Sequence, residues 1–134
     1  MLIRGDANGA SIELSEQNGL RKTDGSEYYR VTLRENQFEV SSLVYAFDPK
    51  DDGLAKFFTG LANDWKGWDG SREWSSLEGE FQLECEHDRV GHVVIRATLH
   101  SNPYGYGWTG QIRFEITPGE LEAVSAEVAQ FFRG

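Results

Sequence analysis

The sequence predicts an α+β fold: a single, mostly antiparallel sheet of about five to six strands, with two helices packed on one face. Three observations favour this class. Several stretches alternate apolar and polar residues, two others carry apolar residues at helical spacing, and the alternating stretches are joined by short connections. Short connections favour antiparallel neighbours, so the strands are expected to pair mainly in chain order.

Composition places the chain among folded globular proteins. Its 134 residues form one predicted domain, 1–134, with 39% hydrophobic and 26% charged residues. The single cysteine, Cys85, excludes an internal disulfide and is typical of a reducing compartment. No run approaches the roughly 18 apolar residues that span a bilayer, and no signal-peptide pattern opens the chain, so we expect a cytoplasmic protein.

The net charge of −9 bears on possible partners. An acidic protein is poorly suited to nucleic acids and to anionic membranes, which are bound through Lys and Arg. It would attract a basic protein and could speed the encounter. We therefore expect no nucleic-acid or membrane partner, and a basic protein as the possible one.

The N-terminal part is predicted to contain two loops, a short strand and a longer strand before a turn. Segments 1–9 and 16–26 are rich in Gly, Asn, Asp and Ser and are expected to be loops, with a short edge strand at 11–14 between them. Alternation from 29 to 34 predicts a longer strand.

Another strand, which begins near Phe38, follows the 29–34 strand after a turn expected at Glu35-Asn36. This turn would set Leu33 opposite Phe38 and Val31 opposite Val40, so that all four apolar side chains share one face.

A helix is predicted to begin at Asp48-Pro49, because Asp caps free amides and Pro suits the first helical position. Gly67 and Gly70 follow it as stop and turn signals. The helix carries one apolar stripe, made of Leu54, Phe57, Phe58, Leu61 and Trp65.

The clearest pattern is a hairpin around Asp88-Arg89-Val90-Gly91. A type I turn with Gly91 left-handed would pair Cys85 with Ile95, Leu83 with Ala97 and Phe81 with Leu99, and would set Glu84 opposite Arg96. In the strand from about Ser76 to His87, the apolar side chains then point inward. The acids of that strand point to the outer face: Glu78, Glu80, Glu84 and Glu86.

The C-terminal part is predicted to contain a Pro/Gly/Tyr loop at 102–107, a strand at 108–116 and a helix. Thr117-Pro118-Gly119-Glu120 matches a helix start, with a Thr cap and a Glu that reaches back. The apolar stripe of this helix is Leu121, Val124, Val128, Phe131 and Phe132.

We predict no metal site, no cofactor and no catalytic residue. His87 and His92 fall on opposite faces of the predicted hairpin, so they cannot share one ion without a bulge, and Asp88 is explained as a turn residue. The paired carboxylates of the outer face resemble those of glycoside hydrolases in spacing, but they would stud a solvated face rather than flank a cleft. An enzymatic function would need two convergent polar groups in a concavity.

The function we expect is therefore non-enzymatic binding. The acidic outer face would meet a basic protein, with Trp68, Tyr104 and Tyr106 as aromatic anchors. The alternative is a small-ligand or carbohydrate-binding module that uses the Trp- and Tyr-rich loops. In either case Trp65 and Trp74 are expected to cap the core where helix meets sheet.

Two motifs, together with the Pro118-Gly119-Glu120 start of the final helix, carry a resemblance to known proteins. The block Trp65-x-Gly67-Trp68-x-Gly70-x-Arg72-x-Trp74-x-Ser76-Leu77-Glu78-Gly79 and the hairpin His87-Asp88-x-x-Gly91-His92-Val93 resemble a small uncharacterised bacterial family. The likeness covers about residues 38–132. It implies a bacterial source and no particular activity or cofactor. In size and charge the chain is also similar in kind to immunity proteins, which neutralise secreted toxins.

Overall fold

A computed structural model describes residues 1–6, 9–15, 27–46, 53–102 and 104–133. These residues form two separate four-stranded antiparallel sheets, with strand orders β1-β2-β3-β4 and β5-β6-β7-β8, and two α-helices. The prediction of a single sheet of five to six strands is therefore wrong. The strands are β1 Leu2–Arg4, β2 Ser11–Ser15, β3 Glu27–Glu35, β4 Phe38–Ala46, β5 Ser71–Ser75, β6 Phe81–His87, β7 Val93–His100 and β8 Thr109–Ile116.

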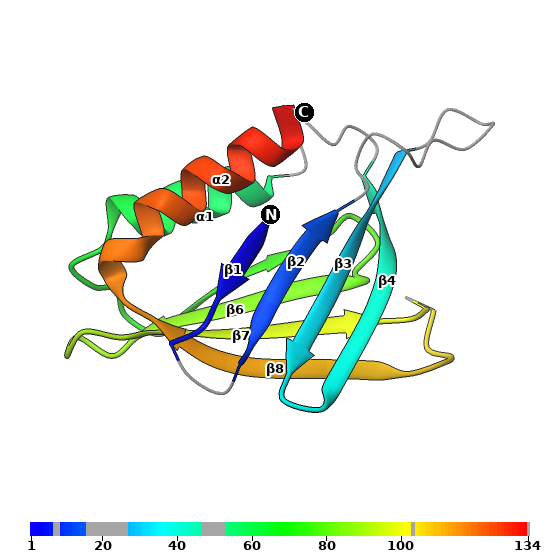
Figure 1. Cartoon of the computed structure of the whole chain (residues 1–134). Coiled ribbons are helices and arrows are strands. Elements are labelled where there is room, and N and C mark those ends of the chain that lie inside the picture. The colour runs from blue at the N-terminus through cyan, green and yellow to red at the C-terminus, as the bar shows by residue number, and fades with distance from the viewer. Residues whose placement is uncertain (7–8, 16–26, 47–52, 103, 134) are drawn as a thin grey trace.

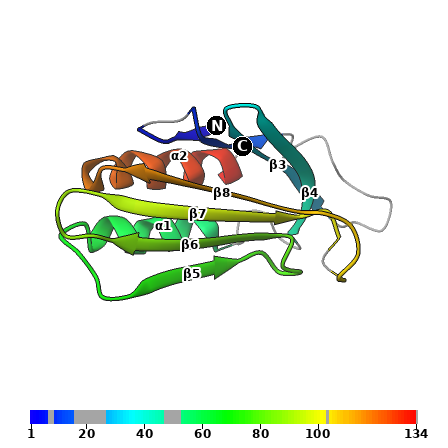
Figure 2. The ribbon, with the colours of Figure 1, turned by 90° about the horizontal axis from the view of Figure 1, so that it is seen from below.

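The two helices and the first sheet lie on the same side of the second sheet. The helices are α1, Leu54–Asn63, and α2, Leu121–Arg133, which follows a short 3-10 turn at Pro118–Glu120. They lie side by side, and the strands of the first sheet cross those of the second (Figure 1). From below, the opposite face of the second sheet carries no other described element (Figure 2). We call this uncovered side the outer face.

The hairpin register predicted around Gly91 is confirmed, whereas the predicted type I turn is wrong because Arg89 has a positive φ of 64°. Cys85 pairs with Ile95 and Glu84 with Arg96, while Gly91 has the left-handed φ of 101° that the turn requires. Alternate residues of β6 and β7 are buried, so one face of this hairpin lies in the core.

Strand β5 was not predicted, because Gly67 and Gly70, which precede it, were interpreted only as stop and turn signals. It pairs with β6, and the ring of Trp74 packs edge-on against Phe81 with centroids 5.5 Å apart. The strand expected from Ser76 begins only at Phe81, since residues 76–80 form the turn that joins β5 to β6 and Gly79 has a φ of 83°. Alternation alone could not separate this turn from the strand that follows it.

The first sheet contains more strands than the sequence predicted. Strand β1 lies within the segment 1–9, which was expected to be a loop, and it makes β2 an interior strand rather than an edge strand. Segment 16–26, also expected to be a loop, lies outside the described residues.

The β3–β4 turn lies at Asn36-Gln37, one residue later than predicted, and Asn36 adopts a φ of 47°. Leu33 is therefore opposite Val40 rather than Phe38, so the predicted pairing is wrong. An Asn tolerates the left-handed conformation that this tight turn uses, which explains why the turn forms there.

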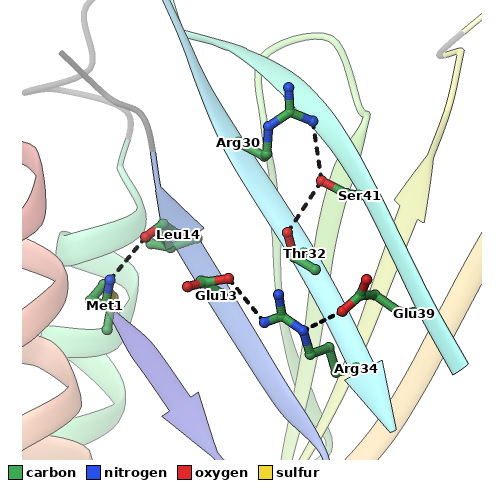
Figure 3. A network of polar contacts seen from close by, with 8 residues as sticks. All are labelled: Met1, Glu13, Leu14, Arg30, Thr32, Arg34, Glu39 and Ser41. Carbon is green, nitrogen blue, oxygen red and sulfur yellow. Dashed lines mark hydrogen bonds and ion pairs between the residues drawn. The ribbon is translucent and has the colours of Figure 1, made fainter. Parts of the chain in front are cut away.

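Polar contacts tie the first sheet together on one side (Figure 3). Arg34 donates to Glu13 on β2, with the two atoms 2.9 Å apart, and also to Glu39 on β4. Further along, the hydroxyl of Ser41 contacts both Thr32 and Arg30 at 3.2 Å. Hydrogen bonds between side chains of β2, β3 and β4 thus join these strands on this side of the sheet.

Helix α1 buries Leu54, Phe58 and Leu61. Its predicted start at Asp48-Pro49 lies outside the described residues. The helix ends before Trp65, whose side chain is 53% exposed, so this tryptophan neither extends the stripe nor caps the core as predicted.

Helix α2 confirms the predicted start and stripe. The amide of Thr117 donates to the Glu120 carboxylate at 3.3 Å, which satisfies one of the free amides of the first turn. Leu121, Val128 and Phe132 are buried, and the ring of Phe132 packs edge-on against Tyr29 of β3.

Two contacts define the junction between the sheets. A Cβ at Gly110 of β8 would lie 2.8 Å from Val40 of β4, so glycine permits the close approach of these strands. Glu80, which was predicted to point to the outer face, is instead only 5% exposed. Its carboxylate accepts from the Tyr45 amide of β4 and from the Ser76 hydroxyl, both at 2.8 Å. The prediction fails for Glu80 because this residue belongs to the turn and not to the alternating strand.

Candidate binding site

The outer face of the second sheet is hollowed. A first hollow of about 570 Å³ lies over the middle of the four strands, and a second of about 360 Å³ adjoins it at the turn 76–80 and the loop 101–108. Gln82 and His100 line both hollows, so the two adjoin, and together we call them the outer groove.

The floor of the outer groove contains a row of uncharged hydrogen-bonding side chains. The strand register places Ser75, Gln82, Thr98 and Gln111 side by side across β5, β6, β7 and β8. The Gln111 amide donates to the Thr98 hydroxyl at 2.9 Å. Since adjacent strands are roughly 4.8 Å apart, the row extends over about 14 Å.

A charged row crosses the sheet beside the uncharged one. It consists of Glu73, Glu84, Arg96 and Arg113, one on each strand. Arg96 and Glu84 form an ion pair at 3.1 Å, and both side chains are about one third exposed, so the Glu84 charge is already partly compensated. Glu73 is exposed at the edge strand.

An aromatic rim closes one end of the outer groove. Tyr104 and Tyr106 are 74% and 80% exposed, and Trp108 is 40% exposed. The loop that carries them is fixed where Ser101 and Trp108 meet: the Trp108 amide donates to the Ser101 hydroxyl at 2.9 Å, and the Ser101 amide donates to the Trp108 carbonyl at 3.0 Å. The rings are therefore presented to solvent from an anchored loop.

Glu78 joins this rim from the opposite side. The Tyr104 hydroxyl donates to the Glu78 carboxylate at 2.8 Å, and this hydrogen bond, together with the negative charge, raises the pKa of Tyr104. The structure thus brings together three of the predicted site residues, namely Glu78, Tyr104 and Tyr106.

The other predicted site residues lie apart from this rim. Glu84 lines the first hollow, and Glu86 is exposed nearer the hairpin turn. Glu80 is buried at the sheet junction. Trp68 is 5% exposed and donates its indole N–H to the Cys85 carbonyl at 3.2 Å, so it is a core residue and no surface anchor.

Sequence reasoning gave no role to the neutral side chains of the groove floor. Gln82, Thr98 and Gln111 occupy the same outward phase as the acids that were singled out. The same alternation, applied to uncharged polar residues as well as to carboxylates, would have identified these three residues as candidates for the site.

The histidines of the hairpin have structural partners. The Asp88 carboxylate accepts from the amides of Val90 and His92, at 2.8 and 2.9 Å, and lies 2.7 Å from the His92 ring. The hydrogen bond to Asp88 raises the pKa of His92. His87 donates to the Trp65 carbonyl at 2.8 Å, which binds the hairpin to the segment after α1.

Within the described residues, no group of three or more His, Cys, Asp or Glu side chains could hold a metal ion. No described helix is long and apolar enough to cross a membrane. Cys85 is buried in the core, and this burial, with the charge of Glu84, raises the pKa of its thiol to about 12.

The fold and the groove together define a class of protein: a small α+β domain of two antiparallel sheets and two helices, with an open polar groove and an aromatic rim on one sheet. The chain belongs to a family of unknown function, DUF6228, whose profile matches residues 3–134. This match spans nearly the whole chain, whereas the resemblance described above covered only about residues 38–132. Searches of curated proteins and of solved structures returned no significant match.

Proposed function

We propose that this protein is a non-enzymatic binding protein that recognises a basic protein through the outer groove, as an immunity protein recognises a toxin. The observation that carries the proposal is the character of the groove lining. Three carboxylates and one guanidinium line it: Glu84 is paired with Arg96, whereas Glu73 and Glu78 form no ion pair among the described residues and lie in the same lining as the aromatic rim. Exposed aromatic rings are enriched at protein-recognition surfaces, and acidic groups beside them would complement a basic partner.

The overall charge supports the same proposal. A chain with a net charge of −9 attracts a basic partner at long range, and association would weaken as salt screens that attraction. We also propose a bacterial, cytoplasmic setting, which suits a single buried thiol such as Cys85.

The proposal is tested by capture of basic proteins from a lysate of the source organism at low and at moderate salt. The informative variant is Glu73→Gln with Glu78→Gln, which removes two charges from the groove. The matched control is Glu122→Gln with Glu127→Gln, which removes two charges from exposed positions of α2.

Both double variants have the same net charge, so they separate the groove from general acidity. We expect the control to retain the partner and the groove variant to lose most of it. Equal retention by both variants, or no salt-dependent capture by the unaltered protein, would contradict the proposal.

A carbohydrate or other small polar ligand is the second candidate. It is favoured by the uncharged row Ser75, Gln82, Thr98 and Gln111, because amide and hydroxyl groups beside aromatic rings suit sugar hydroxyls. Titration of tryptophan fluorescence with a sugar library tests it, with Gln82→Ala as the variant. A flat response across the library would reject this candidate.

A further inference from the structure

The second hollow has the shape of a pocket between two parts of the chain that are distant in sequence. One wall contains Glu78 and Gly79, and the other contains Asn102 and residues 105–109. Its volume of about 360 Å³ has room for one long side chain. The aromatic side chains Tyr106 and Trp108 belong to its lining, and it shares Gln82 and His100 with the first hollow.

Glu78 supplies the negative charge of this pocket. It is the one carboxylate among the lining residues, and within the described part of the chain no Lys, Arg or His side chain forms an ion pair with it. The hydrogen bond from the Tyr104 hydroxyl fixes one of its oxygens. A carboxylate has about four acceptor positions, so both oxygens can still accept from a ligand.

Tyr106 and Trp108 supply aromatic surface on the other wall. A cation over the face of Trp or Tyr is attracted by the ring quadrupole, and a guanidinium can also stack on it through its own plane. An arginine satisfies both walls at once, because its fork can bind a carboxylate with two parallel hydrogen bonds. A lysine ammonium offers a point charge and no plane.

The pocket is preorganised by its own backbone. The paired hydrogen bonds between Ser101 and Trp108 close the base of the loop, and Gly107 adopts a φ of 97° that a side chain would strain. A Cβ at Gly107 would also overlap the Ser101 hydroxyl. Because Ser101 and Trp108 are already held by these hydrogen bonds, little entropy is lost at these two residues when a ligand enters, which favours binding.

We infer that this pocket binds a guanidinium group, and that it takes an arginine side chain of the basic partner, between Glu78 and the rings of Tyr106 and Trp108. The inference rests on the proposed function and names the side chain that the partner inserts. It places the anchoring contact at the aromatic end of the outer groove.

The test is an NMR titration with N-acetyl-arginine amide, followed through the indole N–H of Trp108. The neutral isostere N-acetyl-citrulline amide is the control ligand. We expect a saturable shift with the arginine derivative at millimolar concentration, and little shift with the citrulline derivative.

Two variants locate the binding. Glu78→Gln should weaken the arginine derivative about three- to tenfold, in line with a charge-assisted hydrogen-bonded pair. Glu86→Gln, which changes an exposed acid of the same face outside both hollows, should leave its affinity unchanged. Equal binding of the two ligands, or an unchanged affinity in Glu78→Gln, would overturn the inference.

The capture experiment distinguishes failure of the arginine pocket from failure of the proposed function. A basic partner whose retention depends on Glu73→Gln but ignores Glu78→Gln would sustain the proposed function and reject the arginine pocket. Binding of the arginine derivative at Trp108 without capture of any basic protein would sustain the guanidinium site and reject the protein partner.

Discussion

Replacing Glu80 should destabilise the protein far more than replacing any exposed acid of the same sheet. The residue is 5% exposed, and its carboxylate accepts two hydrogen bonds, from Ser76 in its own turn and from the edge amide of Tyr45 in the other sheet. The Ser76 hydroxyl in turn accepts from the Phe81 amide at 3.1 Å, so this cluster also fixes the start of β6. Glu80 therefore joins the two sheets through polar contacts.

The magnitude follows from the number of hydrogen bonds. A hydrogen bond to a charged group contributes about 1.5–3 kcal/mol, and water that enters the vacated space offsets part of the loss. We expect Glu80→Ala to lower the free energy of unfolding by about 2–4 kcal/mol, a large fraction of the roughly 5–15 kcal/mol of an ordinary domain. Glu80→Gln keeps an oxygen that can accept from Tyr45 and should cost about 1 kcal/mol.

The assay is urea denaturation at 25 °C followed by tryptophan fluorescence, with hydrogen exchange of the Tyr45 amide as a local measure. The control is Glu86→Ala, an exposed acid on β6, which should change the free energy of unfolding by less than about 0.5 kcal/mol. The reasoning is refuted if Glu80→Ala matches this control, or if Tyr45 exchanges no faster in Glu80→Ala than in the unaltered protein.

Three further predictions concern the hairpin, the core thiol and the aromatic loop. Asp88 raises the pKa of His92, so the ion pair stabilises the fold at pH values below the ordinary histidine pKa. This stabilisation is lost as the pH rises through the raised pKa. The substitution Asp88→Asn should lower the pKa of His92 in an NMR titration. The thiol of Cys85, with a pKa of about 12, should react with a disulfide reagent only after denaturation, and fast labelling of the native protein would contradict its burial. Gly107→Ala should cost roughly 1–2 kcal/mol, because the residue has a positive φ and a Cβ would meet Ser101; an unchanged melting temperature would show that the loop relaxes freely.

Local pattern predicted the register of β6 and β7 correctly because the two residues that flank the turn determine every pairing beyond it. Once Asp88 lies opposite His92, each pairing follows, including Glu84 with Arg96. The start of α2 was equally local, since Thr117 and Glu120 satisfy the first turn without help from the rest of the chain. Such features depend on neighbours a few residues apart.

The division into two sheets depended on distant contacts. The residues near Gly110 in the sequence do not indicate that Val40 packs against it. The turn at Glu80 likewise does not indicate that its carboxylate binds the amide of Tyr45, 35 residues earlier. The predictions for Trp65 and Trp68 were wrong for the same reason. Trp68 packs in the core and Trp65 is exposed, although the two are only three residues apart in the sequence. Burial at such positions is a property of tertiary packing.

The candidate site was predicted in part. Glu78, Tyr104 and Tyr106 were chosen from two separate segments and lie at one end of the outer groove. The expected continuous acidic ladder is interrupted by a buried Glu80 and by the ion pair of Glu84. Sequence alternation assigns a face to each side chain but does not reveal which partner it meets there.

The uncovered side of the second sheet separates what the molecule needs to fold from what it presents to others. Gln82, Thr98 and Gln111 project away from the helices, so substituting them leaves the apolar interior intact, and surface changes of this kind seldom alter stability by much. Proteins descended from one ancestor can therefore change these positions while every strand stays in register. We expect members of this family to share the apolar interior and to differ in the side chains of this face.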